Sequence, residues 1–165
     1  MSTPSKTQVA IRSAQVEDVP QILAFIRELA EYERLAHTVT ATEELLRRSL
    51  FGPQPAAEAL IAAVDGVDVG WALFFTNFST FNGLPGLYLE DLYVQPHVRG
   101  RGIGKALLKR IAAFAVERGC GRLEWAVLDW NEPSIQFYRS LEAQPLDEWT
   151  TYRLTGESLK KLATP

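Results

Sequence analysis

Sulfur and imidazole side chains are scarce in this sequence. Its 165 residues include one cysteine, Cys120, one methionine and two histidines, His37 and His97. A single cysteine excludes an internal disulfide and a cysteine metal cluster. No metal ion is therefore expected as a cofactor, and we interpret Cys120 as a structural residue near the end of a helix.

Long apolar runs and an excess of one charge are also missing. No stretch of 18 apolar residues occurs, and residues 1–8, MSTPSKTQ, lack the apolar centre of a secretory signal. We therefore expect a cytoplasmic protein with no membrane partner. The chain has 17 basic and 20 acidic residues, which gives a net charge of −3. Nucleic acid is therefore not expected as a partner, and a cationic substrate is not repelled.

What the sequence does contain is the pattern of one folded α/β domain. A chain of this length, 47% hydrophobic, buries about two thirds of its extended-chain surface as a single domain over residues 1–165, with residues 1–8 as a loose tail. Alternating strand and helix patterns predict a three-layer α/β/α domain around a mixed sheet. Strands are expected at residues 9–14, 58–64, 69–75, 87–94, 123–128 and 149–154, helices from about residues 18, 42, 103, 131 and 157, and a loop at residues 76–86. Phe78 and Phe81 in that loop either pack or wall an acceptor site.

The most informative stretch is the glycine-rich turn RGRGIG at residues 99–104. Glycines at 100, 102 and 104 let the backbone approach a ligand closely, and a helix follows at once. The first free N–H groups of that helix would bind an anion such as a pyrophosphate. The turn is neither a P-loop nor a dinucleotide fingerprint, and the simpler interpretation is a helix N-terminus with glycines in a tight turn.

Two adjacent carboxylates, Glu90 and Asp91, interrupt the apolar strand before this turn. Side chains of adjacent strand residues point to opposite faces, so the two acids cannot share one substrate atom unless a bulge re-aims one of them. The pair either has a catalytic or amine-binding role, or one acid pairs with a buried arginine while the other lies at the edge.

A third segment, WNEPSIQFYRSLEA at residues 130–143, makes the pattern specific. Asn131 is a good helix N-cap and Pro133 falls in the first turn. The stretches YLED, RGRGIG and WN with FY resemble, in this order and spacing, the GCN5-related N-acetyltransferases (GNAT), most closely the diamine (spermidine/spermine) and thialysine acetyltransferase branch. The resemblance implies a GNAT-type fold with a centrally splayed sheet, in which acetyl-CoA lies between the strands at 87–94 and 123–128.

The resemblance also implies a set of site residues. Tyr32, Glu33, Glu90 and Asp91 are expected to contact the substrate amine, although Tyr32 and Glu33 are equally well explained as part of a solvated acidic helix face. The residues expected to bind the cofactor, by the glycine turn and by the resemblance, are Leu92, Tyr93, Val94, Arg99, Gly100, Arg101, Gly102, Ile103, Gly104, Lys105, Asn131, Pro133 and Ser134.

The expected reaction is transfer of an acetyl group from acetyl-CoA to a primary amine of a small polyamine or diamino acid, by direct attack in a ternary complex. An amine of pKa near 10.4 costs roughly 4 to 5 kcal/mol to deprotonate at pH 7, so a base is needed. Glu90, acting through a water, is the candidate base, Asp91 the holder of a distal ammonium, and a backbone amide near Leu92 the donor to the tetrahedral intermediate. Tyr138 either protonates the leaving thiol or is a packed helix residue.

Two alternatives to this reaction remain open. The chain is otherwise a non-catalytic acyl-CoA-binding module, or an acetyltransferase that acts on a peptide or protein amine. If the chain is an enzyme for small amines, the segment AVLDWN at residues 126–131 resembles the thialysine branch more than the polyamine branch. The spacing of DEWT at residues 147–150 differs from that of the polyamine branch and puts spermidine in doubt as the substrate. Members of the resembled branch are usually homodimers, so a homodimer is expected.

Overall fold

The computed structural model describes residues 8–164, so the tail predicted over residues 1–8 lies, apart from Gln8, outside the described residues. The chain divides into two compact units, which meet in sequence between Ala126 and Val127. The first contains β1 (Val9–Ser13), α1 (Val19–Tyr32), α2 (Glu43–Phe51), β2 (Glu58–Val64), β3 (Val67–Ser79), β4 (Leu84–Val94), α3 (Ile103–Glu117) and β5 (Leu123–Trp125), with 3-10 turns at Val16–Asp18, Ala36–Thr38 and Pro96–Val98. The second contains α4 (Glu132–Arg139) and α5 (Gly156–Ala163).

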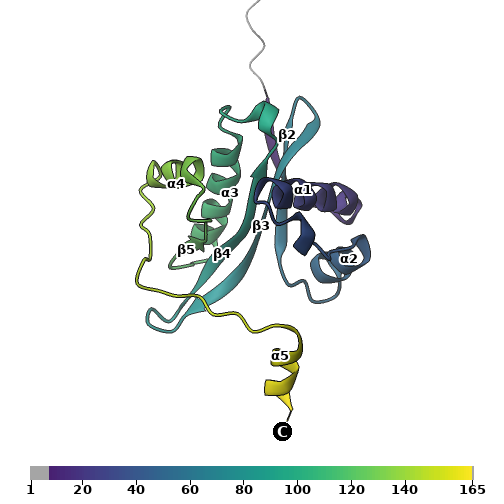
Figure 1. Ribbon diagram of the computed structural model, residues 1–165. Helices are drawn as coiled ribbons and strands as arrows, with labels where there is room; N and C mark the ends of the chain where they lie inside the picture. Colours follow the sequence, from purple (N-terminus) through teal and green to yellow (C-terminus); the bar gives the residue numbers. More distant parts are fainter. Residues whose placement is uncertain (1–7, 165) are drawn as a thin grey trace, which may run out of the picture. The chain divides into compact units, whose positions relative to one another are not determined.

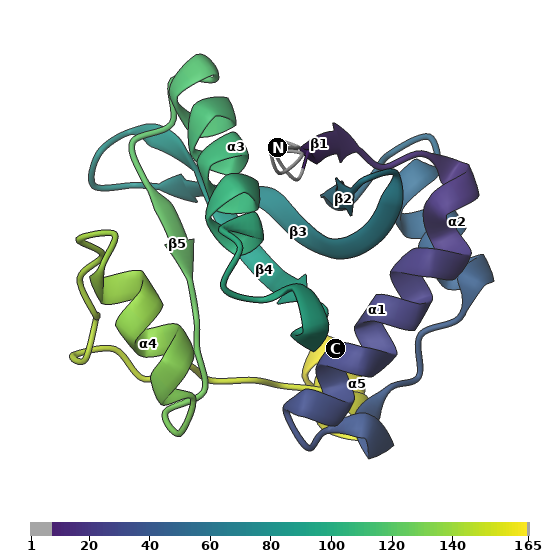
Figure 2. The same ribbon diagram turned by 90° about the horizontal axis from the view of Figure 1, so that it is seen from above.

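The first unit is built on a mixed sheet. Over the described residues its five strands follow the order β1-β2-β3-β4-β5, in which the first three pairs are antiparallel and β4 and β5 are parallel. A parallel pair needs a crossover connection, and α3 supplies it. α1 and α2 cover one face of the sheet and α3 the other (Figures 1 and 2), which confirms the α/β class and the three layers.

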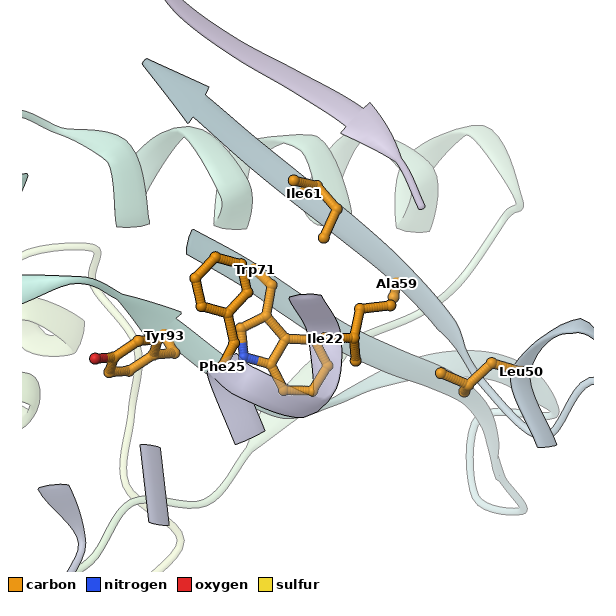
Figure 3. Close-up of a cluster of buried hydrophobic side chains, with 7 residues drawn as sticks. All are labelled: Ile22, Phe25, Leu50, Ala59, Ile61, Trp71 and Tyr93. Carbon is orange, nitrogen blue, oxygen red and sulfur yellow. The ribbon is translucent and has the colours of Figure 1, made fainter. Parts of the chain in front are cut away.

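Alternate residues of β3 pack against the two helical layers. Trp71 faces α1, where it contributes with Ile22 and Phe25 to a cluster of buried side chains (Figure 3). Phe74 points to the opposite face and stacks on Phe114 of α3, with ring centroids 5.9 Å apart. Each fully buried side chain of this size contributes about 1.5–3 kcal/mol, so the core defines which face of each strand is which.

The loop predicted at residues 76–86 is wrong, because β3 continues to Ser79 and β4 begins at Leu84. Pro85 and Gly86, at the end of the expected loop, both pair with β3. Gly86 is needed there for close packing, since a Cβ atom would lie 2.5 Å from Oδ1 of Asn77. The hairpin turn is confined to residues 80–83.

Two predicted strands also differ from the structure. The strand expected at residues 123–128 ends at Trp125, and the one expected at residues 149–154 does not form, although those residues are described. The sequence WTTY has high strand propensity, but propensity reflects packing on a sheet and does not make a strand without a pairing partner. In agreement with this, Trp149 and Tyr152 are 74% and 92% exposed.

The helix ends agree with the local signals in the sequence. The Thr42 hydroxyl accepts a hydrogen bond from the Leu45 amide at 3.2 Å and caps α2. Asn131 caps α4 in the same way, through a 3.4 Å bond from the Ser134 amide. Among residues 8–164 no helix is both long and apolar enough to span a bilayer.

Candidate active site

The glycine turn joins β4 to α3 and has the conformation that its composition predicts. Gly100 and Gly102 have φ angles of 77° and 79°, in the left-handed region that favours glycine. No atom lies within 4 Å of the position of a Cβ at either residue, so both face open space. The turn therefore leaves room for a ligand directly above the start of the helix.

The first turn of α3 presents backbone donors to that space. Gly102 is the N-cap residue and has no side chain to cap the helix, and its carbonyl accepts the first helical bond, from the Ala106 amide at 2.9 Å. The amides of Ile103, Gly104 and Lys105 therefore have no carbonyl partner within the helix. Ile103 is buried and holds the start of the helix against the sheet. Lys105 is exposed, so its positive charge stands in solvent in the same helical turn as the free amides.

A β-bulge separates the two carboxylates of β4. In the β3–β4 ladder Phe74 pairs with Leu89 and Leu73 pairs with Asp91, so Glu90 is an extra residue with no partner on β3. Glu90 is exposed, whereas Asp91 is half-buried. A bulge was the condition under which two adjacent acids could act on one substrate atom. Such a bulge is present, and Glu90 is its extra residue.

The ladder also shows on which face Asp91 lies. Its partner Leu73 packs against the α1 cluster, and two residues further along Trp71 pairs with Tyr93 in the same cluster. Asp91 is therefore on the α1 face of the sheet, where Glu33 lies just after the last residue of α1.

Two other carboxylates act on Asp91. Burial, together with the negative charges of Glu90 and Glu33, raises the pKa of Asp91 to about 6. Burial also raises the pKa of Glu33. The charges acting on Asp91 in the described part of the chain are both negative, which makes this end of α1 a place where a cation would be stabilised.

Beyond the bulge, β4 loses its parallel neighbour. The β4–β5 ladder joins Leu87 to Leu123, Tyr88 to Glu124 and Leu89 to Trp125, and it ends there. β4 itself continues to Val94, so residues 90–94, which include the predicted cofactor contacts Leu92, Tyr93 and Val94, have no partner on β5. The splayed arrangement predicted for the sheet is therefore present on this edge, next to the glycine turn.

The predicted cofactor residues Leu92 and Val94 are half-buried, and Tyr93 is not free to face a ligand. Tyr93 is 5% exposed and packs against Phe25 with ring centroids 6.1 Å apart. Burial and a hydrogen bond to Glu28 raise the pKa of Tyr93 to about 12. Only its backbone is placed to contact a cofactor, since the side chain belongs to the core.

The remaining predicted residues lie in the second unit. Asn131 is buried and caps α4, Pro133 and Ser134 form the first turn, and Tyr138 is half-buried near the helix end. The rings of Phe137 and Tyr138 lie 5.3 Å apart. The first unit thus carries the glycine turn and the predicted acidic residues, and the second carries Tyr138, the predicted acid, on α4.

Tyr88, which sequence reasoning did not single out, also lies near these carboxylates. Burial raises the pKa of Tyr88, and the charges of Glu90 and Glu124 raise it further. Tyr88 stands two positions before Glu90 in the strand, a spacing that could have indicated it. No three His, Cys, Asp or Glu side chains in the described residues are grouped so that they could hold a metal ion.

Comparison with known proteins agrees with this geometry. The sequence model of the Acetyltransferase (GNAT) family matches residues 23–142. A thialysine N-epsilon-acetyltransferase of Bos taurus is 41% identical over 166 residues, which cover 94% of this chain and 97% of that protein. An L-ornithine N5-acetyltransferase of Arabidopsis thaliana is 32% identical, with 92% and 86% covered. Among solved structures, an integron cassette protein of V. cholerae superposes with a TM-score of 0.79 at 28% identity, covering 95% of this chain and 98% of that one.

Proposed function

This chain belongs to the acetyltransferase (GNAT) family, and from that premise we propose that it moves the acetyl group of acetyl-CoA to a primary amine of a small polyamine or diamino acid. The observation that carries the proposal is the group of three carboxylates, Glu33, Glu90 and Asp91, beside the glycine turn. A diamino compound keeps one positive charge while its other amine reacts, and such a charge favours an acidic site. The two relatives named for thialysine and L-ornithine support this substrate class.

Acetyl-CoA fits the described residues of the turn. Its pyrophosphate would accept hydrogen bonds from the free amides at Ile103, Gly104 and Lys105, in the space left open at Gly100 and Gly102. The acyl arm would then follow residues 92–94 of β4, where no β5 strand competes for the backbone. The thioester supplies the activated acetyl group, and the protein positions it.

The carboxylates divide the work on the amine. Glu90, re-aimed and exposed by the bulge, accepts the proton of the attacking ammonium through a water molecule. Asp91, with a pKa of about 6, is charged at pH 7 and holds the second ammonium together with Glu33. The free amine attacks the thioester carbonyl directly, and a backbone amide near Leu92 donates to the resulting oxyanion. The C–S bond breaks as the intermediate collapses, and the nitrogen releases its extra proton to solvent.

The second unit supplies the proton for the leaving group. Tyr138 donates its phenolic proton to the thiolate, whose pKa of about 8.5 makes this step less demanding than deprotonation of the amine. Asn131, Pro133 and Ser134 at the start of α4 contact the CoA chain. Asn131 supports this role because its side chain holds the first turn of α4 in place.

Assembly as a homodimer in the cytoplasm completes the proposal. Supporting it, the second unit exposes large apolar side chains that a partner copy would cover, among them Trp149, Tyr152 and Leu162. Small-angle scattering at micromolar concentration should return twice the mass of one chain. A mass equal to that of one chain would contradict the dimer.

An acceptor panel tests the reaction. Thialysine, L-ornithine, spermidine and a lysine peptide are each incubated with acetyl-CoA, and release of the CoA thiol is followed. We expect the highest kcat/KM with a diamino acid. If no amine releases thiol while calorimetry detects CoA binding, the chain is an acyl-CoA-binding module, and if the peptide is preferred, the substrate class proposed here is wrong.

A further inference from the structure

The side chain of Arg99, the first residue of the glycine turn, is directed toward the end of α1. Its Nε donates a hydrogen bond to the Val94 carbonyl at 2.8 Å, which holds it across the end of β4. The guanidinium carbon lies 4.7 Å from the centre of the Tyr32 ring and 5.7 Å from that of Tyr93. Tyr32 is the last residue of α1, directly before Glu33.

A second contact joins the same two parts of the fold. The Gln95 side-chain amide donates to both carboxylate oxygens of Glu28, at 3.3 and 3.4 Å, and the buried Tyr93 hydroxyl is also hydrogen-bonded to Glu28. Glu28 lies one turn before Tyr32 on α1. The end of α1 therefore contacts the segment between β4 and α3 in two places, at Glu28 and one helical turn later at Tyr32. Only the second contact, with Arg99, involves the glycine turn.

We propose that Arg99 is a positioning residue that couples the two substrates, because it links the turn that receives CoA to the end of α1 that carries the acceptor residues Tyr32 and Glu33. A ligand that orders the turn would hold Arg99 against Tyr32 and so hold Glu33 opposite Asp91. CoA and the amine then strengthen each other's binding, by the same factor in either order. The inference rests on the proposed function and adds to it the residue that connects the two sites.

The chemistry of the stack predicts which replacements fail. A planar guanidinium stacked on an aromatic ring at an exposed position, as Arg99 is, contributes an effect of roughly 2- to 5-fold. Lysine keeps the charge but has neither the planar group nor the Nε donor. If Arg99 acted only as a charge for a CoA phosphate, lysine would replace it, whereas a stacking role would be lost.

Calorimetry of CoA binding, with and without saturating thialysine, measures the coupling directly. In the wild type we expect thialysine to lower the Kd of CoA by about 2- to 5-fold. Arg99→Met and Arg99→Lys should reduce this factor to about 1. Arg110→Met is the matched control, since Arg110 also stacks on a ring, 4.1 Å from the centre of Phe114 on α3, and should keep the wild-type factor.

Replacement of the ring partner separates stacking from the tyrosine hydroxyl. Tyr32→Phe retains the ring and should keep the coupling factor, whereas Tyr32→Leu should lose it. A coupling factor of about 1 in the wild type, or a full factor in Arg99→Lys or Tyr32→Leu, would overturn the inference.

Hydrogen exchange provides an arm that needs no acceptor. CoA alone should slow exchange at the amides of residues 29–33 in the wild type and in Arg110→Met, but not in Arg99→Met. Normal CoA binding with unchanged exchange at these amides would overturn the coupling and leave the proposed function intact. Absence of CoA binding to the wild type would instead overturn the proposed function, and the coupling with it.

Discussion

Both units of the chain carry predicted site residues, but they differ in how many apolar side chains are buried beneath those residues. In the described part of the first unit, buried apolar side chains occur from Val19 to Ala115, and they support the glycine turn, the bulge and the end of α1. In residues 127–164 the one buried residue is Asn131, a polar helix cap. Groups on a packed core are held in place by folding, whereas a segment whose apolar side chains are at most partly buried has less stability of its own. The elements that carry the proposed pyrophosphate and amine sites are therefore supported by the core, whereas the segment that carries Tyr138 has little such support.

The largest effect expected is on catalysis in the first unit. Glu90→Gln keeps the shape of the side chain but removes the proton acceptor, so kcat/KM should fall by about 10²- to 10⁴-fold at neutral pH. The loss should shrink at pH 9 to 10, where more of the amine is already deprotonated. Steady-state rates across this pH range check it, and a wild-type rate at neutral pH would show that Glu90 is not the base.

A pair of aromatic truncations sharpens the contrast in stability. Phe25 is fully buried and Trp149 is 74% exposed. Phe25→Ala should lower the free energy of unfolding by about 3–5 kcal/mol, whereas Trp149→Ala should change it by less than about 0.5 kcal/mol at protein concentrations where the chain is a monomer. Urea unfolding of both variants is the measurement. Equal losses would mean that the second unit has a core of its own.

The free energy of unfolding should depend on pH through one carboxylate of the first unit, Asp91. The pKa of Asp91 is raised from 3.8 to about 6, so its contribution to stability is complete below about pH 4 and is lost as the pH rises through 6. Asp91→Asn should therefore gain stability over the wild type between pH 4 and 7, by up to about 3 kcal/mol. The exposed Asp147→Asn is the control and should follow the wild type in denaturant unfolding at each pH; a parallel curve for Asp91→Asn would contradict the prediction.

Substitution in the glycine turn tests whether that part of the first unit binds the cofactor. Gly102→Asp places a Cβ at a φ of 79° and a negative charge where the pyrophosphate is proposed to lie. The KM for acetyl-CoA should rise more than about tenfold through charge repulsion alone. Gly102→Ala keeps the strain and omits the charge, so it should cause a smaller increase. Unchanged CoA affinity of the aspartate variant in calorimetry would exclude this site.

The smallest effect is expected in the second unit. Tyr138→Phe should lower kcat by about tenfold with little change in the KM for acetyl-CoA, because only the departing thiolate lacks its proton donor. Steady-state kinetics with varied acetyl-CoA separates the two parameters. A rise in KM with an unchanged kcat would instead indicate that Tyr138 binds the cofactor.

Local signals in the sequence were sufficient for much of the first unit. The glycines of the turn, the Thr42 cap and the pair of acids in β4 each have a conformation or chemistry that only a few residue types allow. The exact register was not accessible, because the bulge at Glu90 depends on the pairing of β4 with β3 across the hairpin. The same applies to the stacking of Arg99 on Tyr32, whose residues are 67 positions apart and are joined only by the tertiary fold.

The failures in the second half have a different cause. Residues 149–154 have the composition of a strand, and the prediction of one assumed that a neighbouring strand would be within reach. Pairing is a property of the whole sheet, so a six-residue pattern does not reveal whether a partner edge exists. The extension of β5 to residue 128 was wrong for the same reason, since its ladder with β4 ends at Trp125.

The bulge has a consequence for how readily this enzyme could be redesigned. As an additional residue without a ladder partner, Glu90 does not set the register of the sheet, and the chemistry proposed for it needs only its side chain. Its side chain can be exchanged for another base, or shortened, while β3 and β4 keep every pairing they have. Deletion of the same residue would remove the bulge and make Leu89 and Asp91 neighbours, each still opposite its present partner, Phe74 or Leu73. The strand would lose the carboxylate and the local irregularity but keep its pairing, so neither a new side chain nor a shorter chain at position 90 changes the register.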